Sequence, residues 1–341
     1  MRKVPVTILT GHLGAGKTTL LRRLLTNDLG KRIAVIENEF GNEVGIERLL
    51  AGTTLSEDSV MRSEDLFVEL SNGCVCCSVK DTLVSTLETL LERSRDRIDH
   101  IVVETTGLAD PGPLAGIFWL DDELESELIL DGVLTVVDVA NLESRLNSQA
   151  NEALLQIAYA DHIVLNKKDL LSDEQVDHVR QRVRKINPTA PILSCKFGMV
   201  DLSFCLDIKA FDSSRLRLHA LPGNELTDAQ VVHDKGITSM VIKNSHNPID
   251  LDKLRSLIAS MLWEPPEGLE VFRIKGVLWS KQDPSRVHTI QAVHKIFDME
   301  KLGEEICWKD VDFGQPITKM VIIGNIPDKN GIEREFERNW S

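Results

Sequence analysis

Long hydrophobic runs are missing from this chain of 341 residues. No stretch approaches the roughly 18 consecutive apolar residues of a membrane-spanning helix, so we expect none. The short apolar run VPVTIL at 4–9 is followed at once by a glycine-rich turn and Lys17. Those residues end the run too early for a secretory signal peptide. Internal repeats and low-complexity tracts are lacking too, which favours an ordinary globular chain.

Cysteine is also scarce, and its distribution is uneven. Three of the six cysteines lie within four positions, and the others are scattered. A disulfide framework would spread paired cysteines along a small secreted domain, so we expect a reducing compartment, the cytosol or the nucleus. We interpret the scattered cysteines as small buried apolar residues. They are Cys195, Cys205 and Cys307.

Basic residues are outnumbered, with 39 Lys and Arg against 53 Asp and Glu, and the net charge is -14. This balance argues against duplex nucleic acid or an anionic membrane as the main partner. Apolar residues make up 42% of the chain, which is enough for a full core. The length predicts two domains, one of them smaller.

The first two thirds of the chain alternate β-branched runs with helix-period segments. The runs are almost continuously apolar, as in parallel strands covered by helices on both faces. This alternation predicts a doubly wound α/β domain over residues 1–214 with a mostly parallel sheet. Residues 41–66 interrupt it with an acidic stretch, which we interpret as a long loop, either a lid or docking segment or simply disordered. The predicted strands are 4–9, 32–37, 100–104, 133–138 and 162–166, and the predicted helices include 18–25 and 81–95.

A change of pattern follows residues 215–236, which are polar and irregular and are predicted to form a linker. Residues 237–341 then predict a small α+β domain with several strands and two helices. This part has no recognisable catalytic set, so we interpret it as a partner-facing or regulatory surface. The predicted strands are 237–244, 269–279, 287–297 and 318–325, and the predicted helices are 250–263 and 331–340.

The segment GHLGAGKT at 11–18 fits the phosphate-binding loop pattern, with a strand before it and a helix after it. Its glycines allow backbone N–H groups to curl around phosphate oxygens, and the helix start adds partial positive charge. We expect Lys17 to reach the β- and γ-phosphates and Thr18 to bind Mg²⁺. The predicted phosphate-binding residues are Gly11, His12, Leu13, Gly14, Ala15, Gly16, Lys17, Thr18 and Thr19.

The segment NKKD at 166–169 follows a predicted strand. In this motif the Asp169 carboxylate would accept two hydrogen bonds from guanine, Asn166 would contact the base edge, and a lysine stem would pack on the base. We therefore include Lys167 and Lys168 in the predicted base site. Adenine lacks both donors, and an unpaired buried carboxylate would cost on the order of 1–3 kcal/mol. The chain is therefore predicted to bind GTP rather than ATP, which speaks against a small-molecule kinase.

Two further strand ends face the same crevice. VVETTG at 102–107 places Glu104 where it could bind Mg²⁺ directly or through water, and the Gly107 amide where it could contact a γ-phosphate. ENEFG at 37–41 ends another strand and supplies Glu37. Catalysis of γ-phosphate hydrolysis would then rest on positioning and on charge stabilisation by Lys17 and Mg²⁺.

Between these two strand ends lies SNGCVCCSVKD at 71–81, with Cys74, Cys76 and Cys77. Three thiolates select a soft or borderline ion, Zn²⁺ or Cu(I), over Mg²⁺. They leave one coordination position open for water, for Glu37 or for a group from a recipient protein. Such a site can hold an ion and then release it. A redox-active thiol set and a purely structural zinc remain alternatives, as do nickel or cobalt as the ion.

Together GHLGAGKTT, ENEFG, SNGCVCCSVKD, VVETTGLADPGP, LDGVLTVVD and NKKD resemble the CobW-type metallochaperone GTPases, most of all their eukaryotic branch of zinc-regulated GTPase metalloprotein activators. The resemblance covers nearly the whole chain. It implies a P-loop GTPase domain, a smaller CobW C-terminal domain, and zinc that passes to client metalloproteins with GTP hydrolysis. It also implies that residues of the cysteine segment lie beside the nucleotide: Cys77, Ser78, Val79, Lys80 and Asp81.

The resemblance also bears on the client. Relatives in the eukaryotic branch carry an N-terminal extension that docks on a type 1 methionine aminopeptidase. This chain begins at the first predicted strand. The resemblance implies a client zinc metalloprotein. Because this sequence does not include the docking extension, methionine aminopeptidase is an open candidate for that client.

Overall fold

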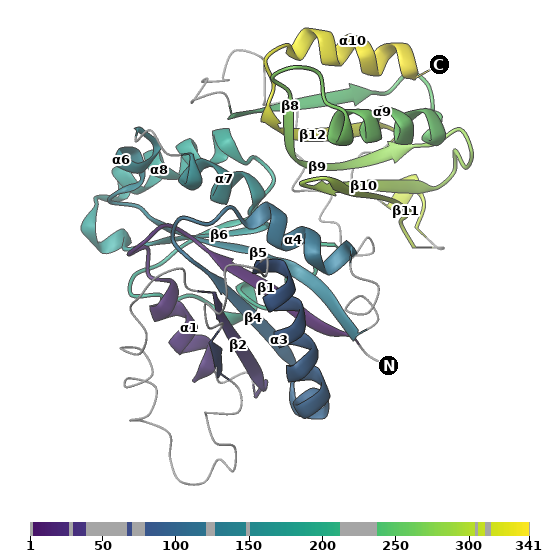
Figure 1. The fold of residues 1–341 in the computed structure, drawn as a ribbon. Coiled ribbons are helices and arrows are strands. Elements are labelled where there is room, and N and C mark those ends of the chain that lie inside the picture. The colour runs from purple at the N-terminus through teal and green to yellow at the C-terminus, as the bar shows by residue number, and fades with distance from the viewer. Residues whose placement is uncertain are drawn as a thin grey trace.

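The chain folds into two domains, each built on one sheet, in a computed structural model (Figure 1). For 37, 38, 67–69, 79–82, 119, 120 and 339 only the backbone is described. The described residues are 3–26, 30–38, 67–69, 79–120, 127–147, 151–211, 237–303, 306–310 and 315–340.

The first domain contains a seven-stranded sheet in the order β3-β2-β4-β1-β5-β6-β7, and every neighbouring pair is parallel. Strand β1 is central: on one side the chain builds outward through β5, β6 and β7, and on the other side β4 lies between β1 and β2. The predicted α/β domain with a parallel doubly wound sheet is confirmed, and all five predicted strands belong to it. The strands are β1 (Val4–Thr10), β2 (Ile33–Asn38), β3 (Phe67–Glu69), β4 (His100–Thr105), β5 (Leu128–Asp138), β6 (His162–Asn166) and β7 (Ile192–Ser194).

Helices cover both faces of this sheet. Apolar residues of α1 pack on one face together with the segment 195–206. The remaining large helices pack on the other face, where α3 and α4 lie in front of the strands in Figure 1. The helices are α1 (Lys17–Leu25), α3 (Val79–Ser94), α4 (Pro111–Leu120), α6 (Leu142–Asn147), α7 (Glu152–Tyr159) and α8 (Asp173–Ile186).

The second domain contains a five-stranded antiparallel sheet in the order β11-β10-β9-β12-β8. Along β12, Met320 and Ile322 face the core beneath α9 and α10, whereas Val321 and Ile323 face the first domain. This period of two is what a strand between two covered faces requires. The elements are β8 (Ile237–Asn244), α9 (Leu251–Trp263), β9 (Glu270–Trp279), β10 (Val287–Val293), β11 (Ile296–Lys301), β12 (Thr318–Asn325) and α10 (Lys329–Asn339).

The predicted strand 287–297 is wrong in extent, because two strands and a turn occupy these residues. Residues 287–297 form the whole of β10 and the start of β11, which pair as a hairpin. The turn falls at His294, whose φ of 55° is left-handed. A histidine in that conformation is uncommon, so the apolar run carried no visible turn signal. The predicted small α+β domain is nevertheless confirmed.

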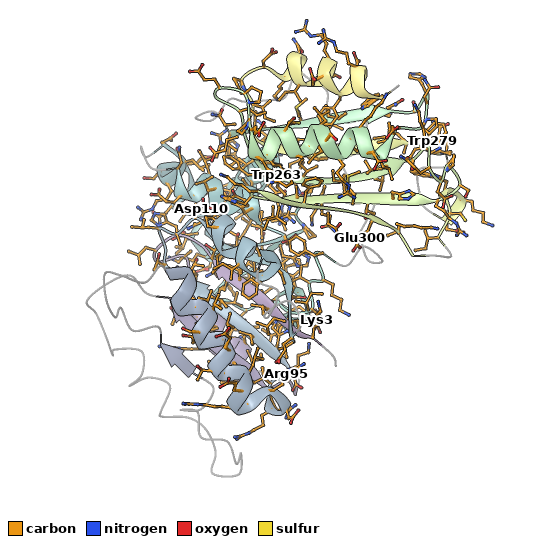
Figure 2. The ribbon with its side chains drawn as sticks, turned by 45° about the vertical axis from the view of Figure 1, so that its right-hand side comes forward. Lys3, Arg95, Asp110, Trp263, Trp279 and Glu300 are labelled. Atoms are coloured by element: carbon orange, nitrogen blue, oxygen red, sulfur yellow. The ribbon has the colours of Figure 1, made fainter. Side chains whose placement is uncertain are left out.

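The two domains share one continuous apolar cluster, in which residues of α7 and α8 pack with Phe272, Val321 and Ile323 of the second sheet. Beside this cluster lies a cavity of about 230 Å³ whose lining includes Lys3 of the first domain and Glu300 of the second (Figure 2). The second domain therefore packs against the helical face of the first domain.

Two expectations concern residues outside the described part of the chain. The predicted loop 41–66 lies there, and so does the predicted linker 215–236. Among the described residues no helix combines the length and apolar character needed to cross a membrane.

Candidate nucleotide-binding site

The turn between β1 and α1 has the backbone of a phosphate-binding loop. Gly11, Gly14 and Gly16 all adopt positive φ, and Gly16 is the residue that precedes the first turn of α1. A Cβ on Gly16 would lie 2.3 Å from the Asn166 side-chain nitrogen, so only glycine fits at φ 106°. The first turn of α1 carries no acidic residue, so its partial positive charge is available to an anion.

Lys17 begins α1 and is buried at the centre of this turn. Its Nζ donates a hydrogen bond to the Gly11 carbonyl oxygen at 2.8 Å. That bond holds the ammonium over the loop, where it would meet phosphate oxygens. Thr18 follows in the same helical turn and is half-buried, while Thr19 is exposed.

The loop after β4 lies against the phosphate-binding loop. Thr105 Oγ1 donates to Thr10 Oγ1 at 2.9 Å, which joins the ends of β4 and β1. A Cβ on Gly107 would lie 2.4 Å from the Leu13 main-chain nitrogen, so the two loops touch at glycine. Gln156 of α7 holds the same loop from behind, since its Nε2 donates to the Gly107 and Ala109 carbonyl oxygens at 3.1 and 3.2 Å.

Strand register places the two predicted acidic ligands side by side. Glu37 of β2 is the Cα partner of Glu104 of β4, and Asn38 is the partner of Thr105. On its other side Glu37 pairs with Glu69 of β3. Neighbouring strands are about 4.8 Å apart. Glu104 is buried at the end of its strand. The strand ends that carry Glu37 and Glu104 therefore meet at one edge of the sheet.

The segment after β6 meets the phosphate-binding loop from the opposite side. Asn166 is buried, and its Nδ2 donates to the Ala15 carbonyl oxygen at 2.9 Å. Lys167 adopts a left-handed φ of 64°, and its Nζ donates to the Asp138 carboxylate at 2.8 Å. Burial alone would raise the pKa of Asp138, but Lys167 and Asn141 hold it below its ordinary value. Lys168 and Asp169 are exposed in the short 3₁₀ turn that follows.

A loop that the sequence did not single out completes this side. Asn166 Oδ1 accepts from the Gly198 amide at 3.1 Å and from the Cys195 thiol at 3.4 Å. Cys195 is buried, as expected for a scattered cysteine, and burial raises the pKa of its thiol. Phe197 stands 65% exposed at φ 52° beside it. The preceding strand β7 has only three residues, which is too short a run to indicate a functional loop.

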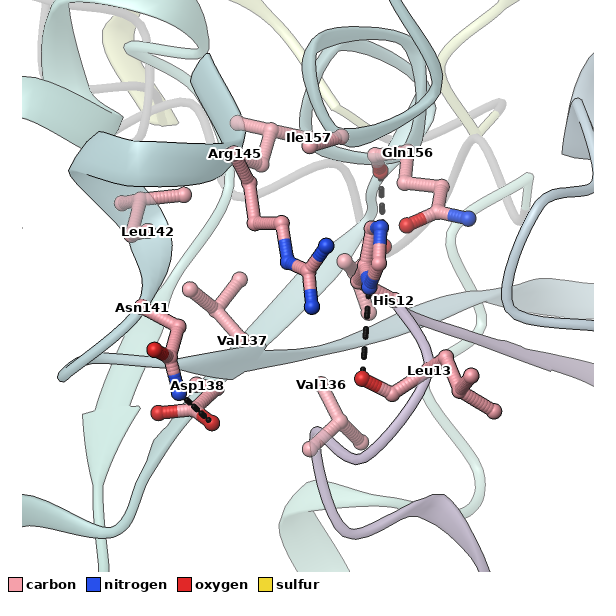
Figure 3. A pocket seen from close by; sticks show the side chains of 12 residues that line it. His12, Leu13, Val136, Val137, Asp138, Asn141, Leu142, Arg145, Gln156 and Ile157 are labelled. Carbon is pink, nitrogen blue, oxygen red and sulfur yellow. Dashed lines mark hydrogen bonds between the residues drawn. The ribbon is translucent and has the colours of Figure 1, made fainter. Parts of the chain in front are cut away.

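A small cavity beside the phosphate-binding loop is lined by His12, Asp138, Arg145 and Gln156 (Figure 3). Its volume is about 20 Å³, room for about one water molecule. Arg145 reaches into the cavity from α6. Residues of the phosphate-binding loop and of α7 therefore line the same cavity.

The predicted metal ligands are only partly described. Cys74, Cys76, Cys77 and Ser78 lie outside the described residues, as does the side chain of Glu37. Val79, Lys80 and Asp81 form the first turn of α3, of which only the backbone is described. Within the described part of the chain no cluster of three or more His, Cys, Asp or Glu side chains could hold a metal ion.

Family models match both halves of the chain. The CobW/HypB/UreG nucleotide-binding domain matches residues 5–194, and the cobalamin synthesis protein cobW C-terminal domain matches residues 237–339. Zinc-regulated GTPase metalloprotein activator 1 of Schizosaccharomyces pombe is 38% identical over 332 residues, which cover 89% of this chain and 78% of that protein. The zinc chaperone YjiA of Escherichia coli is 32% identical over 334 residues, which cover 95% of each chain.

Solved structures agree with this likeness. The Zn(II)-bound YjiA GTPase from Escherichia coli matches with a TM-score of 0.71 and 28% identity, and both chains are covered completely. A Zn(II)-bound triple mutant of that protein, with one glutamate and two cysteines changed to alanine, matches with a TM-score of 0.73.

Proposed function

The chain belongs to the CobW/HypB/UreG family of nucleotide-binding proteins, and from this premise we propose that it is a GTP-hydrolysing zinc chaperone. It binds Mg²⁺ and GTP at the carboxyl edge of the parallel sheet, holds zinc with Cys74, Cys76 and Cys77, and transfers the ion to a client metalloprotein. The names of its relatives support the metal and the nucleotide, since they are zinc chaperones and zinc-regulated GTPases.

The nucleotide contacts follow from the loops at this edge. Lys17 exchanges its bond to the Gly11 carbonyl for phosphate oxygens, and the backbone amides of residues 11–18 surround them. Thr18 and Glu104 take the Mg²⁺ side, and the Gly107 amide meets the γ-phosphate. Asp169, exposed on the base side, accepts from guanine. Mg²⁺, once bound, neutralises charge on the transferring phosphoryl group.

Water attack then depends on positioning and on charge stabilisation by Lys17. Hydrolysis removes the γ-phosphate and with it the contact to Gly107, so the loop after β4 relaxes. The proposal assigns no arginine to the charge that develops on the transferring phosphoryl group. We therefore expect slow intrinsic turnover.

The observation that carries the coupling to zinc is the register of β2 on β4. Glu37, the proposed fourth ligand of the zinc, is the Cα partner of Glu104, the proposed Mg²⁺ ligand. In the sequence the cysteine segment lies between β3, which pairs with β2, and the first turn of α3. A change in contacts at the γ-phosphate would therefore reach Glu37 across one strand spacing of about 4.8 Å.

Competition with a chelator tests the proposal. We expect the zinc affinity of the protein to differ at least tenfold between its GDP-bound form and its form with a non-hydrolysable GTP analogue, both with Mg²⁺. Equal affinities in both forms, and in the nucleotide-free protein, would contradict the coupling. A zinc that resists chelators in every state and whose removal unfolds the domain would instead indicate a structural ion.

Affinity rather than zinc content has to be measured, because a relative that lacks one glutamate and two cysteines is still a zinc-bound structure. The test variant is Cys76→Ala with Cys77→Ala, for which we expect at least a hundredfold weaker zinc binding. The matched control is Cys307→Ala, a cysteine of the second domain close to Arg286. It should bind zinc as the natural chain does.

A further inference from the structure

Helix α7 contacts both the loop at the γ-phosphate side and the second domain. We propose that Gln156 is a positioning residue that sets this loop, and that α7 transmits the position of the loop to the second domain through Tyr159 and Asp161. The inference rests on the proposed function, since it takes GTP as the ligand whose γ-phosphate meets Gly107.

Gln156 acts as a clamp on the loop after β4. It is only 2% exposed, and its Nε2 donates to the carbonyl oxygens of Gly107 and Ala109, two residues apart. Its own main-chain oxygen accepts from Thr135 Oγ1 at 2.7 Å, which fixes the helix to β5. Between the clamped carbonyls Leu108 points outward and is 63% exposed. The clamp therefore fixes the peptide groups that follow Gly107 and Ala109, and so limits how far the main chain at Gly107 can move.

The other end of α7 holds the second domain. The Tyr159 ring lies against Gly112 of α4, where a Cβ would come within 2.4 Å of it, and against Phe272 of β9 with ring centroids 5.6 Å apart. The Tyr159 main-chain oxygen accepts from Arg273 at 2.6 Å. Asp110, at the start of α4, lies at the same junction in Figure 2.

Asp161, two residues after the end of α7, also contacts the second domain. Its carboxylate pairs with the guanidinium of Arg273, accepts from Lys275 Nζ at 2.8 Å, and accepts from the Val133 amide at 3.0 Å. Burial alone would raise the pKa of Asp161, but the two cations of β9 lower it, so the carboxylate stays charged. Asp161 therefore links Arg273 and Lys275 of β9 to Val133 of β5.

The helix between these contacts is short and buried. It has eight residues, about 12 Å of length, and six of them are buried. Because most of its side chains are closely packed, we expect this short helix to move as one body. A shift of Gly107 and Ala109 would displace Gln156, to which both are hydrogen-bonded. It would therefore also displace Tyr159, three residues later on the same helix.

Substitution of Gln156 tests the clamp. Gln156→Met keeps the length of the side chain and removes both donors, so we expect at least tenfold weaker binding of a non-hydrolysable GTP analogue and a tenfold lower kcat. GDP binding should stay within twofold, since GDP has no γ-phosphate. The matched control is Asn244→Asp in the second domain, a buried amide that also donates to a loop carbonyl. It should leave both nucleotide affinities within twofold.

A second variant keeps the test decisive if Gln156→Met folds poorly. In Gln156→Glu a protonated carboxyl can donate one hydrogen bond, whereas a carboxylate would face two carbonyl oxygens. Its kcat relative to the natural chain should therefore rise as the pH falls from 8 to 6. A ratio that does not change with pH would overturn the role of the side chain as a donor.

Hydrogen exchange tests transmission to the second domain. In the natural chain we expect residues 270–275 to exchange at different rates with GDP and with the GTP analogue, and this difference should vanish in Gln156→Met. If the natural chain does not bind GTP, the proposed function itself is wrong. If the natural chain binds and hydrolyses GTP while the variant keeps its affinity ratio and its exchange difference, only the present inference is overturned.

Discussion

Gly107 is the residue at which the loop after β4 touches the phosphate-binding loop. An added Cβ would lie 2.4 Å from the Leu13 main-chain nitrogen, so Gly107→Ala must push the loop away. We expect the variant to bind a non-hydrolysable GTP analogue at least tenfold more weakly, with a smaller effect on GDP, as measured by calorimetry. Gly116→Ala in α4 is the control, since its Cβ would lie 3.4 Å from Ile296. A uniform loss for both nucleotides would contradict a specific role at the γ-phosphate.

Asp169 is the residue on which the predicted choice of guanine depends. It is exposed in the turn after β6, next to the bonds that Asn166 makes to the phosphate-binding loop. We expect Asp169→Ala to weaken GTP binding by ten- to a hundredfold, equivalent to about 1–3 kcal/mol for two lost hydrogen bonds to a charged acceptor. ATP binding should not weaken, because adenine lacks both donors. Competition between the two nucleotides measures this, with Asp177→Ala of α8 as the control, and an unchanged preference for GTP would exclude the assignment.

Residue types in the sequence indicated the chemistry of this edge but not the partners of each side chain. Asn166 was expected at the base edge, and the structure gives its amide bonds to Ala15 and Gly198. Ala15 is 151 residues away in the chain and Gly198 is 32 residues away. Such partners follow from the order of the strands, which no local motif specifies. The same holds for Gln156. Nothing in the sequence around this glutamine indicates that its side chain bonds to a loop 47 to 49 residues earlier in the chain.

At the scale of elements, burial decided which strands could be predicted. β4 and β6 are buried along their whole length and β1 at every residue but Pro5, so each contains an apolar run. β3 and β7 have three residues each, which is too few for any period to be visible. The hairpin of β10 and β11 was missed because its turn depends on a left-handed histidine rather than on glycine or asparagine.

Three strands of the first sheet are joined by a buried polar cluster, which makes stability depend on pH. His100 of β4 lies 2.7 Å from Thr7 Oγ1 of β1, and Thr7 in turn donates to Asp131 of β5. Burial lowers the pKa of His100 to about 4, against 6.5 for the ordinary side chain, and the nearby Lys31 adds to this shift while Asp207 opposes it. The native state therefore holds the imidazole neutral.

The sign of the effect follows from these two pKa values. Between pH 6.5 and about 4 the unfolded chain binds a proton at His100 and the folded chain does not, so stability falls as the pH falls through this window. The full loss is about 3 kcal/mol. Urea unfolding at pH 7 and pH 5 should show a smaller pH dependence for His100→Asn than for the natural chain. Burial raises the pKa of Asp131, which acts in the opposite direction at the acid end, so the comparison stops at pH 5.

At the scale of the whole molecule, the two domains are expected to unfold together because one apolar cluster runs through both. The charged pair of Asp161 with Arg273 lies inside the same junction, and both side chains are 1% exposed. A buried pair adds little stability by itself, since both ions lose their hydration. Removal of one partner is costly because it leaves the other charge buried.

Arg273→Met therefore tests how the domains are joined. In the variant Lys275 is the one remaining cation bonded to Asp161, and burial lowers the pKa of Lys275 to about 8. The variant also lacks the bond from Arg273 to the Tyr159 carbonyl. We expect a loss of about 3 kcal/mol in unfolding free energy and a separation of the two domains into distinct thermal transitions. Lys275→Met is the matched control, because Arg273 still pairs with Asp161 in that variant. It should cost about 1 kcal/mol and keep a single transition in calorimetry. Equal losses in the two variants would show that net charge, rather than the buried guanidinium, holds the domains together.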